Sequence, residues 1–392
     1  MSSKNAGLYI HIPFCMRKCP YCDFYSVTDL ALKPRFLKAL IAEMQLVSAE
    51  GLCFDTLYIG GGTPSVYGYP DIGQIITAIS RNFELHPYAE ITIEVNPGTV
   101  SIEQLKGYRE AGINRINIGV QSFYPQNLDF LGRIHSANEA RNAVTNAQRA
   151  GFQNIGLDLI YGLPDQSKAD WRADLQQAVD YDPTHLSCYM LTYEKGTPLY
   201  NGLKGGQIQP LADGNVRTLF ETTIEYLEEH KYLQYEISNF ARIGNDGKPH
   251  ISKHNLKYWN RVPYIGLGPS AHSFVEPQRY WNVSSVGPYI AAVESGRLPV
   301  AEQEVLSEQQ QMIEAIYLGL RMTAGIDLVG FKAKYGIDFI KAFKAVITDL
   351  EKRNYVEVKN SRCALTKRGR AFLDSITTMF VTHDVSDTEA EN

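Results

Sequence analysis

The chain lacks the long apolar segments and the strong charge imbalance that would indicate a membrane protein or a disordered one. No apolar run in its 392 residues approaches the roughly 20 residues that span a bilayer. The N-terminus has no apolar core of the kind that signal peptides carry. Charged residues make up 21% of the chain and hydrophobic residues 44%, with a net charge of −5. We therefore expect a globular cytoplasmic protein whose thiols stay reduced.

Cysteine is scarce, yet three of the six cysteines lie close together. Cys15, Cys19 and Cys22 form a C-x3-C-x2-C pattern. A disulfide framework requires an even number of cysteines, and structural zinc usually takes four ligands in two separated pairs. Three thiolates on one short loop instead suit a [4Fe–4S] cluster that leaves one iron open for chemistry.

Two simpler interpretations of these cysteines stay open at this point. His11 could complete a zinc site as a fourth ligand, or the three thiols could be buried and inert. The remaining cysteines stand alone and are interpreted as packing residues; they are Cys53, Cys188 and Cys363.

Short β-branched runs alternate with amphipathic stretches from residue 7 to about 240, and the runs appear apolar on both faces, as buried parallel strands are. The expected strands are Leu8–Ile12, Thr56–Ile59, Ile91–Val95, Arg115–Val120, Ile155–Ile160 and His185–Leu191. The expected helices are Pro34–Ser48, Ile72–Phe83, Ile102–Ala111, Ala137–Ala150, Lys168–Tyr181 and Asn215–His230. Six such units are too few for a closed eight-stranded barrel. We predict an α/β fold built on a partial (β/α)6 barrel.

Polar clusters follow the C-terminal ends of several expected strands. They are Gly60-Gly61-Gly62-Thr63-Pro64, Glu94-Val95-Asn96-Pro97, Gly119-Val120-Gln121-Ser122 and, late in its strand, Asp158. Parallel strands bring such ends to one face of a barrel, which is where barrel enzymes place their sites. We therefore expect one site built from these separated segments.

The pattern changes beyond Tyr232, first to turns, aromatics and short strands and then to helices with a hairpin-like segment near residues 352–365. This C-terminal part resembles a winged-helix module. Between Phe331 and Asp374 it carries eleven Lys/Arg and five Asp/Glu, a basic surface or simply solvated faces. The expected parts are a barrel core at 1–240, a linking β and aromatic segment at 241–300, the winged-helix-like domain at 301–380 and a disordered tail at 381–392.

The cysteine loop and the glycine run after the second strand resemble the signature of the radical S-adenosylmethionine (SAM) superfamily. This resemblance implies the predicted barrel, a [4Fe–4S] cluster on the three cysteines, and SAM bound at its open iron. It implies that Glu94 binds the SAM ammonium and that Arg133 grips its carboxylate. The full set of implied SAM-binding residues is Tyr9, Tyr21, Gly61, Gly62, Thr63, Glu94, Gln121, Arg133, Asp158 and His272. Taken singly, each side chain could equally be a structural cap or ion-pair partner.

Similarity over nearly the whole chain narrows the branch of this superfamily. The runs Ile10–Cys15, Gly119–Phe123 and Leu131–His135 resemble oxygen-independent coproporphyrinogen III oxidases and their sister family, the HemW-type haem chaperones. The oxidases carry a further cysteine where this chain has Phe24, and a longer N-terminal extension. Both departures favour the chaperone family. Oxidative decarboxylation to protoporphyrinogen IX is the alternative, and whether the protein is an enzyme stays open.

The segment His254-Asn255-Leu256-Lys257-Tyr258-Trp259 matches the HNxxYW haem-binding motif of HemW-type proteins. The match implies that His254 ligates haem iron, that Tyr258 and Trp259 contact the macrocycle, and that Lys257 meets a propionate. An imidazole can ligate haem iron, and aromatic rings can pack along its apolar faces. Seen without the motif, a histidine beside aromatics would be a hydrogen-bonded core residue.

The resemblance also implies partners. Haem would be the cargo, haemoproteins such as respiratory enzymes the acceptors, and another protein the haem donor. The basic C-terminal domain could contact a membrane surface or an acidic partner. Winged-helix modules also bind nucleic acid, but we expect none here.

Overall fold

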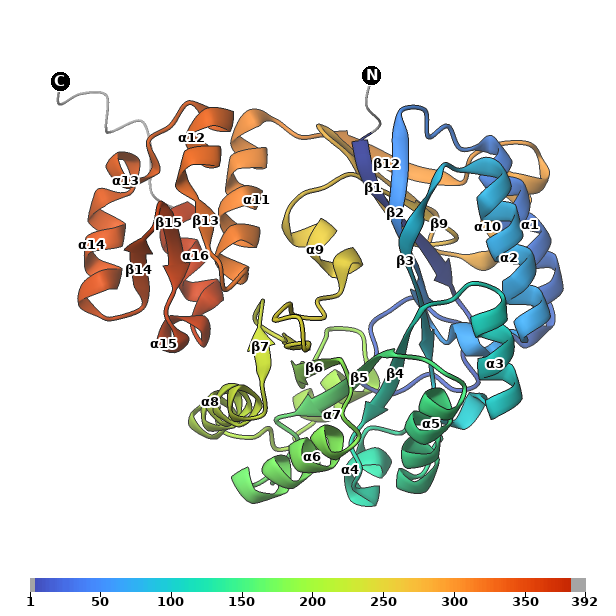
Figure 1. Cartoon of the computed structure of the whole chain (residues 1–392), viewed down its shortest axis with the longest axis horizontal. Coiled ribbons are helices and arrows are strands. Elements are labelled where there is room, and N and C mark those ends of the chain that lie inside the picture. Colours follow the sequence, from blue (N-terminus) through green and yellow to red (C-terminus); the bar gives the residue numbers. More distant parts are fainter. Residues whose placement is uncertain (1–3, 382–392) are drawn as a thin grey trace.

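The computed structural model describes residues 4–381, so the predicted disordered tail lies outside the described residues apart from Val381. Six adjacent parallel strands form the centre of one curved sheet (Figure 1). Their bounds are β1 (Lys4–Ile12), β2 (Leu52–Gly61), β3 (Leu85–Val95), β4 (Arg115–Gln121), β5 (Asn154–Tyr161) and β6 (His185–Met190). The predicted partial (β/α)6 barrel is confirmed.

Helices follow each of these strands, and most of them cover the outer face of the sheet (Figure 1). They are α1 (Lys33–Leu46), α2 (Tyr69–Asn82), α3 (Ile102–Glu110), α4 (Pro125–Phe130), α5 (Ala137–Arg149), α6 (Lys168–Asp180), α7 (Pro198–Lys204) and α8 (Asp213–Glu229). Short 3-10 turns are η1 (Leu30–Leu32), η2 (Pro64–Val66) and η3 (Pro97–Thr99). Capping boxes begin α5 at Ser136 and α6 at Ser167. The short helices α4 and α7 were not predicted, because neither is long enough to show a repeated helical pattern of apolar residues.

The sheet extends beyond the barrel strands at both sides and has twelve strands in all. The added strands are β7 (Tyr232–Gln234), β8 (Asn239–Arg242), β9 (Tyr264–Leu267), β10 (His272–Val275), β11 (Gln278–Asn282) and β12 (Val300–Val305). Because β9 pairs in parallel with β1, from Gly7 opposite Tyr264, the linking segment continues the sheet. Two helices of this segment were also missed, α9 (Lys253–Trp259) and α10 (Val286–Glu294).

The C-terminal part has a hydrophobic core of its own, with Phe339, Phe343 and Phe380 in mutual contact. Its helices are α11 (Glu308–Arg321), α12 (Leu328–Tyr335), α13 (Phe339–Ala342), α14 (Lys344–Lys352), α15 (Lys367–Arg370) and α16 (Leu373–Val381). Its antiparallel sheet has the order β13 (Ile326–Asp327), β15 (Arg362–Leu365) and β14 (Val356–Lys359). The exact division of the chain at residues 240, 300 and 380 stays a prediction.

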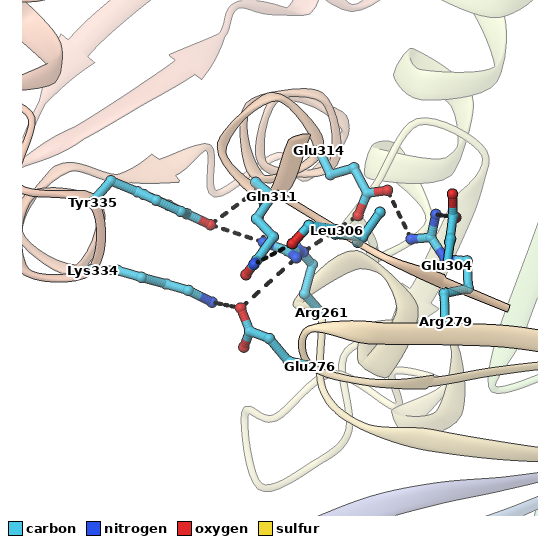
Figure 2. Close-up of polar contacts among 9 residues, drawn as sticks. All are labelled: Arg261, Glu276, Arg279, Glu304, Leu306, Gln311, Glu314, Lys334 and Tyr335. Atoms are coloured by element: carbon cyan, nitrogen blue, oxygen red, sulfur yellow. Dashed lines mark hydrogen bonds and ion pairs between the residues drawn. The ribbon is translucent and has the colours of Figure 1, made fainter. Parts of the chain in front are cut away.

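Arg261 joins the C-terminal part to the rest of the molecule, as Figure 2 shows. Its Nη1 donates to the carbonyl oxygen of Gln311 and to the hydroxyl of Tyr335, both at 2.8 Å. The carboxylates of Glu314 and Glu276 lie at 3.6 and 3.8 Å from its other nitrogens. A nearly buried guanidinium therefore holds α11 and α12 against the loop after α9.

No helix within residues 4–381 combines the length and the apolar character that crossing a membrane requires.

Candidate functional site

The three clustered cysteines lie on the loop between β1 and α1, and backbone hydrogen bonds fix both ends of that loop. Cys15 N donates to Val27 O (2.9 Å), and Val27 N donates to Pro13 O (2.7 Å). At its far side the loop is held by α7, where Leu199 N donates to Pro20 O (3.0 Å). The Cys15 side chain is buried, while those of Cys19 and Cys22 are partly exposed.

The glycine run after β2 seats this loop. Gly61 has a φ of +110°, and a Cβ there would lie 2.8 Å from the His11 ring. A Cβ on Gly62 would lie 2.7 Å from Phe14 O and 3.0 Å from Cys15 Sγ. The resemblance implies that Gly61 and Gly62 bind SAM, which stays a prediction; the structure shows that the cysteine loop also packs closely against this backbone. The glycine run therefore allows the cysteine loop to lie directly against the end of β2.

The donor set fits a cluster rather than a single ion. Within residues 4–381 no three His, Cys, Asp or Glu side chains are gathered closely enough for one metal ion. His11, the candidate fourth zinc ligand, has both ring nitrogens in contact with other groups, Tyr9 Oη at 3.1 Å and Tyr25 O at 2.9 Å. A cubane spaces its thiolates more widely than zinc does, and it takes three cysteines when one iron stays open.

Two partly buried carboxylates lie on the inner face of the barrel and line the same cavity as Cys22. Glu94 accepts a hydrogen bond from the Tyr58 hydroxyl (2.7 Å), and Asp158 accepts one from Asn117 Nδ2 (2.6 Å). Burial is the main cause that raises the pKa of Glu94 to about 7. The hydrogen bond from Tyr58 opposes this shift, and the nearby charge of Asp158 adds to it. Burial also raises the pKa of Asp158. A cation bound beside Glu94 would favour the charged form of this carboxylate.

Arg133 connects the cysteine loop to the strand ends. Its Nη2 donates to Gly119 O (2.8 Å), and its Nη1 lies 3.5 Å from Cys19 Sγ and 3.4 Å from Tyr21 Oη. Among the buried polar atoms of residues 4–381 that have no hydrogen-bond partner are Arg133 Nε and Asp158 Oδ1. A free donor and a free acceptor suit the carboxylate and a hydroxyl of SAM. Gln121, at the end of β4, has a φ of +68°, a strained value for a non-glycine residue that is typical of functional sites.

One cavity of about 1170 Å³ joins these groups to the C-terminal domain. At one end it is lined by predicted site residues, which are Tyr21, Cys22, Gly61, Gly62, Thr63, Glu94, Gln121, Arg133 and Asp158. At the other end its walls come from α8, α11 and the segment 370–375. The volume exceeds the roughly 300–1,000 Å³ of an ordinary small-molecule pocket.

The predicted haem motif forms helix α9, which lies between the sheet and α11 (Figure 1). His254 is only 1% exposed; its Nδ1 lies 2.8 Å from Thr56 Oγ1 and its Nε2 2.9 Å from Tyr258 Oη. Its ring stacks on Tyr58, which separates it from Glu94. Burial lowers the pKa of His254 to about 3, so the ring is neutral. In this arrangement the imidazole is occupied and closed off from the cavity.

The rest of the motif is also engaged. Lys257, predicted to meet a propionate, instead forms an ion pair with Asp55 and is almost buried. The Arg321 guanidinium lies over the Trp259 indole, with its Cζ 4.3 Å from the centre of the ring, and Arg321 lines the cavity. None of the motif residues 254–259 lines the described cavity; Trp259 contacts Arg321, and Arg321 lines it.

Two predicted SAM-binding residues lie apart from the described cavity lining. His272 begins β10, is exposed, and stacks on Trp281 with ring centres 5.5 Å apart. Tyr9 packs beside the stacked rings of Tyr58 and His254 in the barrel interior. The structure brings neither to the walls that Glu94 and Asp158 share.

The prediction that the barrel strands are apolar on both faces is wrong. Polar residues recur at every second position on the inner face, Thr92 and Glu94 on β3 and Arg115 and Asn117 on β4. These polar side chains point into the barrel, where Glu94 and Asn117 line the cavity. Tyr58 and Asn117, which hold the two carboxylates, were missed, although this alternation within apolar strands would have indicated them.

Similarity to known proteins agrees with this geometry. Residues 9–178 match the model of the radical SAM superfamily, and residues 306–372 match the HemN C-terminal domain. A solved structure of coproporphyrinogen III oxidase (HemN) from Escherichia coli superposes with a TM-score of 0.83 at 22% identity, covering 98% of this chain and 92% of that one. The fold and site therefore define a radical SAM protein with a HemN-type C-terminal domain. The radical SAM domain, residues 9–178, is the part that takes a [4Fe–4S] cluster and SAM.

Two relatives define the family. The heme chaperone HemW of Bacillus subtilis is 34% identical over 367 residues, 92% of this chain and 95% of its own length. The heme chaperone HemW of Lactococcus lactis is 32% identical over 388 residues, 98% of this chain and all of its own length. The chain belongs to the HemW family.

Proposed function

We propose that this protein is a haem chaperone that binds haem, holds a SAM-associated [4Fe–4S] cluster, and delivers haem to acceptor haemoproteins. The observation that carries the proposal is the large cavity, which begins at the cysteine loop and ends at the C-terminal domain. It has room for a second molecule besides SAM. Chaperones of the same family match this chain over nearly its whole length.

At the cofactor end the chain supplies ligands and fixed charges. Cys15, Cys19 and Cys22 would hold the cluster, Glu94 would receive the SAM ammonium, and Arg133 its carboxylate. One-electron chemistry is what such a cluster supplies when bound. Anaerobic reconstitution with iron and sulfide tests this assignment, because SAM should alter the EPR signal of the reduced cluster. A spectrum identical with and without SAM would contradict it.

We propose that haem iron is ligated by His254, with Tyr258 and Trp259 beside the macrocycle. Ligation through Nε2 requires that the contact with the Tyr258 hydroxyl be exchanged for iron, so α9 must move. His254→Gln fills the same buried space without a haem ligand, and His250→Gln is a matched control on an exposed loop. The Soret band of bound haem should shift only in His254→Gln. An unchanged band in both variants would sink the ligand assignment.

The rival function is coproporphyrinogen III oxidation. Phe24, at the position of the additional oxidase cysteine, is 70% exposed at the cavity. We expect no protoporphyrinogen IX when the reconstituted protein is incubated anaerobically with reductant, SAM and coproporphyrinogen III. Steady formation of that product would replace the chaperone proposal with an oxidase.

We place this function in the cytoplasm, where the thiols of the six cysteines would stay reduced. Haem would come from a donor protein and pass to acceptors such as respiratory enzymes. The basic C-terminal domain would contact an acidic partner or a membrane surface. Several of its cations are already paired internally, including Lys332 with Asp338 and Lys334 with Glu276, which reduces the charge available for such contacts.

A further inference from the structure

Three guanidinium groups from distant parts of the chain line the end of the cavity opposite the cysteine loop. They belong to Arg217 on α8, Arg321 on α11 and Arg370 on α15. No motif predicted this grouping, because it forms only when the C-terminal domain lies against the barrel. Guanidinium groups are well suited to carboxylates, which they can bind through two parallel hydrogen bonds.

Arg370 is the least satisfied of the three. It is partly buried, and its Nη1 donates to the neutral amide oxygen of Gln234 (2.6 Å). Its Nε is buried and has no hydrogen-bond partner among residues 4–381. Burial lowers the pKa of this guanidinium, which reflects the cost of holding the charge there. A bound anion would relieve that cost.

Arg217 and Arg321 differ in what they can offer. Arg321 is paired with the fully buried carboxylate of Glu236 (2.8 Å) and lies over Trp259, so most of its binding capacity is used. Arg217 forms a solvent-exposed pair with Glu221 at 3.3 Å. Exposed pairs of this kind contribute little and exchange readily. Arg217 and Arg370 are therefore the two available cations, and Arg321 links them to α9.

Large apolar side chains line the same region and are unusually exposed. Tyr189 and Met190 at the end of β6 are 40% and 48% exposed, and Tyr317 on α11 is 38% exposed. All three line the cavity, together with Phe220 and Phe372. Exposed aromatic and thioether groups gathered in a cavity are typical of a binding surface for a flat apolar ligand.

We propose that this end of the cavity recognises the carboxylates of haem, with Arg217 and Arg370 receiving the two propionates and Tyr189, Met190 and Tyr317 contacting the ring. The proposal rests on the proposed function and adds the propionate partners that the motif does not supply, since Lys257 is paired with Asp55. Asp213 and Asp374 also line this end. Because their carboxylates would repel the propionates, the propionates must bind directly to the guanidinium groups.

The test compares haem with its dimethyl ester, which has the same ring and iron but no carboxylates. Both are titrated in the same buffer and cosolvent into the full-length, cluster-reconstituted protein. A charged hydrogen-bonding partner is worth about 1.5–3 kcal/mol, so the protein should prefer haem by about tenfold or more. Arg370→Gln should lose most of this preference and Arg217→Gln part of it. Arg353→Gln, an exposed arginine of the same domain, is the matched control and should keep it.

Each outcome bears on the proposal. Equal affinity of the unmodified protein for haem and ester overturns it and leaves haem binding intact. A preference that survives in both Arg370→Gln and Arg217→Gln also overturns it. If neither probe binds, the proposed chaperone function fails, and this inference fails with it. If Arg370→Gln loses its cluster EPR signal, Arg370→Lys replaces it; that variant keeps the charge and should keep part of the preference.

Discussion

The two ends of the cavity are built in contrasting ways. At the cysteine loop both carboxylates are already hydrogen-bonded to neighbouring strands, in the pairs Tyr58 with Glu94 and Asn117 with Asp158. At the C-terminal domain, Tyr189 and Arg217 are exposed, and the walls come from elements more than a hundred residues apart. The first end is held by hydrogen bonds between barrel strands, whereas the second depends on the docking of two hydrophobic cores.

This difference matches the two molecules that the ends are proposed to hold. A resident cofactor benefits from fixed dipoles and charges, because they need no rearrangement when it reacts. A cargo must enter and leave, so its site is better made from exposed apolar groups and weakly engaged cations. Four predictions follow from this contrast, in order of decreasing effect.

Replacing any one of Cys15, Cys19 or Cys22 by Ala should abolish the SAM-responsive EPR signal of the reconstituted protein, because the cluster then has too few thiolates. Cys53→Ala is the control and should keep the signal. If the two ends are independent, the haem affinity of the cysteine variants should stay within about threefold of the unmodified protein. If the cysteine variants lost haem binding together with the cluster, the two ends of the cavity would not be independent.

Arg261→Ala should weaken the docking that creates the second end. The substitution removes a buried cation and leaves Glu276 and Glu314 without it, which typically costs about 3 kcal/mol. Urea unfolding followed by tryptophan fluorescence measures the loss. Arg353→Ala breaks an exposed pair and should cost less than about 1 kcal/mol. Similar losses in the two variants would show that Arg261 does not hold the domain.

Glu94→Gln should weaken SAM binding by about tenfold or more at pH 8, since a buried charged hydrogen bond is lost. The pH dependence has a definite sign. Glu94 has a pKa of about 7 when the site is empty, and only its charged form attracts the ammonium. SAM affinity should therefore rise from pH 6 to pH 8 in the unmodified protein. This Glu94-dependent rise should be absent in Glu94→Gln, and the same slope in both would contradict the assignment.

Tyr58→Phe should have the smallest effect. The hydroxyl lowers the pKa of Glu94 through its hydrogen bond, so its loss should move the midpoint of the pH dependence upward by less than about one unit. The ring remains and still stacks on His254, so haem binding should not change. Tyr108→Phe removes a buried hydroxyl elsewhere and should leave the midpoint where it is.

The barrel could be predicted from the sequence because its strands and helices follow local patterns, and most of the implied SAM-binding residues line one cavity. Each expected strand lies on or within a few residues of its counterpart, and Gly112 and Gly151 end α3 and α5 with φ values of +104° and +89°. The second end could not be predicted, since Arg217 and Arg370 meet only through tertiary contacts. The HNxxYW motif identified His254 but not its burial, which follows from the close packing of α9 on Gly7 of β1.

The central claim is that one cavity holds SAM and haem at separate ends. The most direct test is to add haem anaerobically to cluster-reconstituted protein saturated with SAM and to record the EPR spectrum. We predict that the SAM-altered cluster signal persists while one equivalent of haem binds. Return of the signal to its SAM-free form as haem binds would show that the two molecules compete, and would contradict the claim.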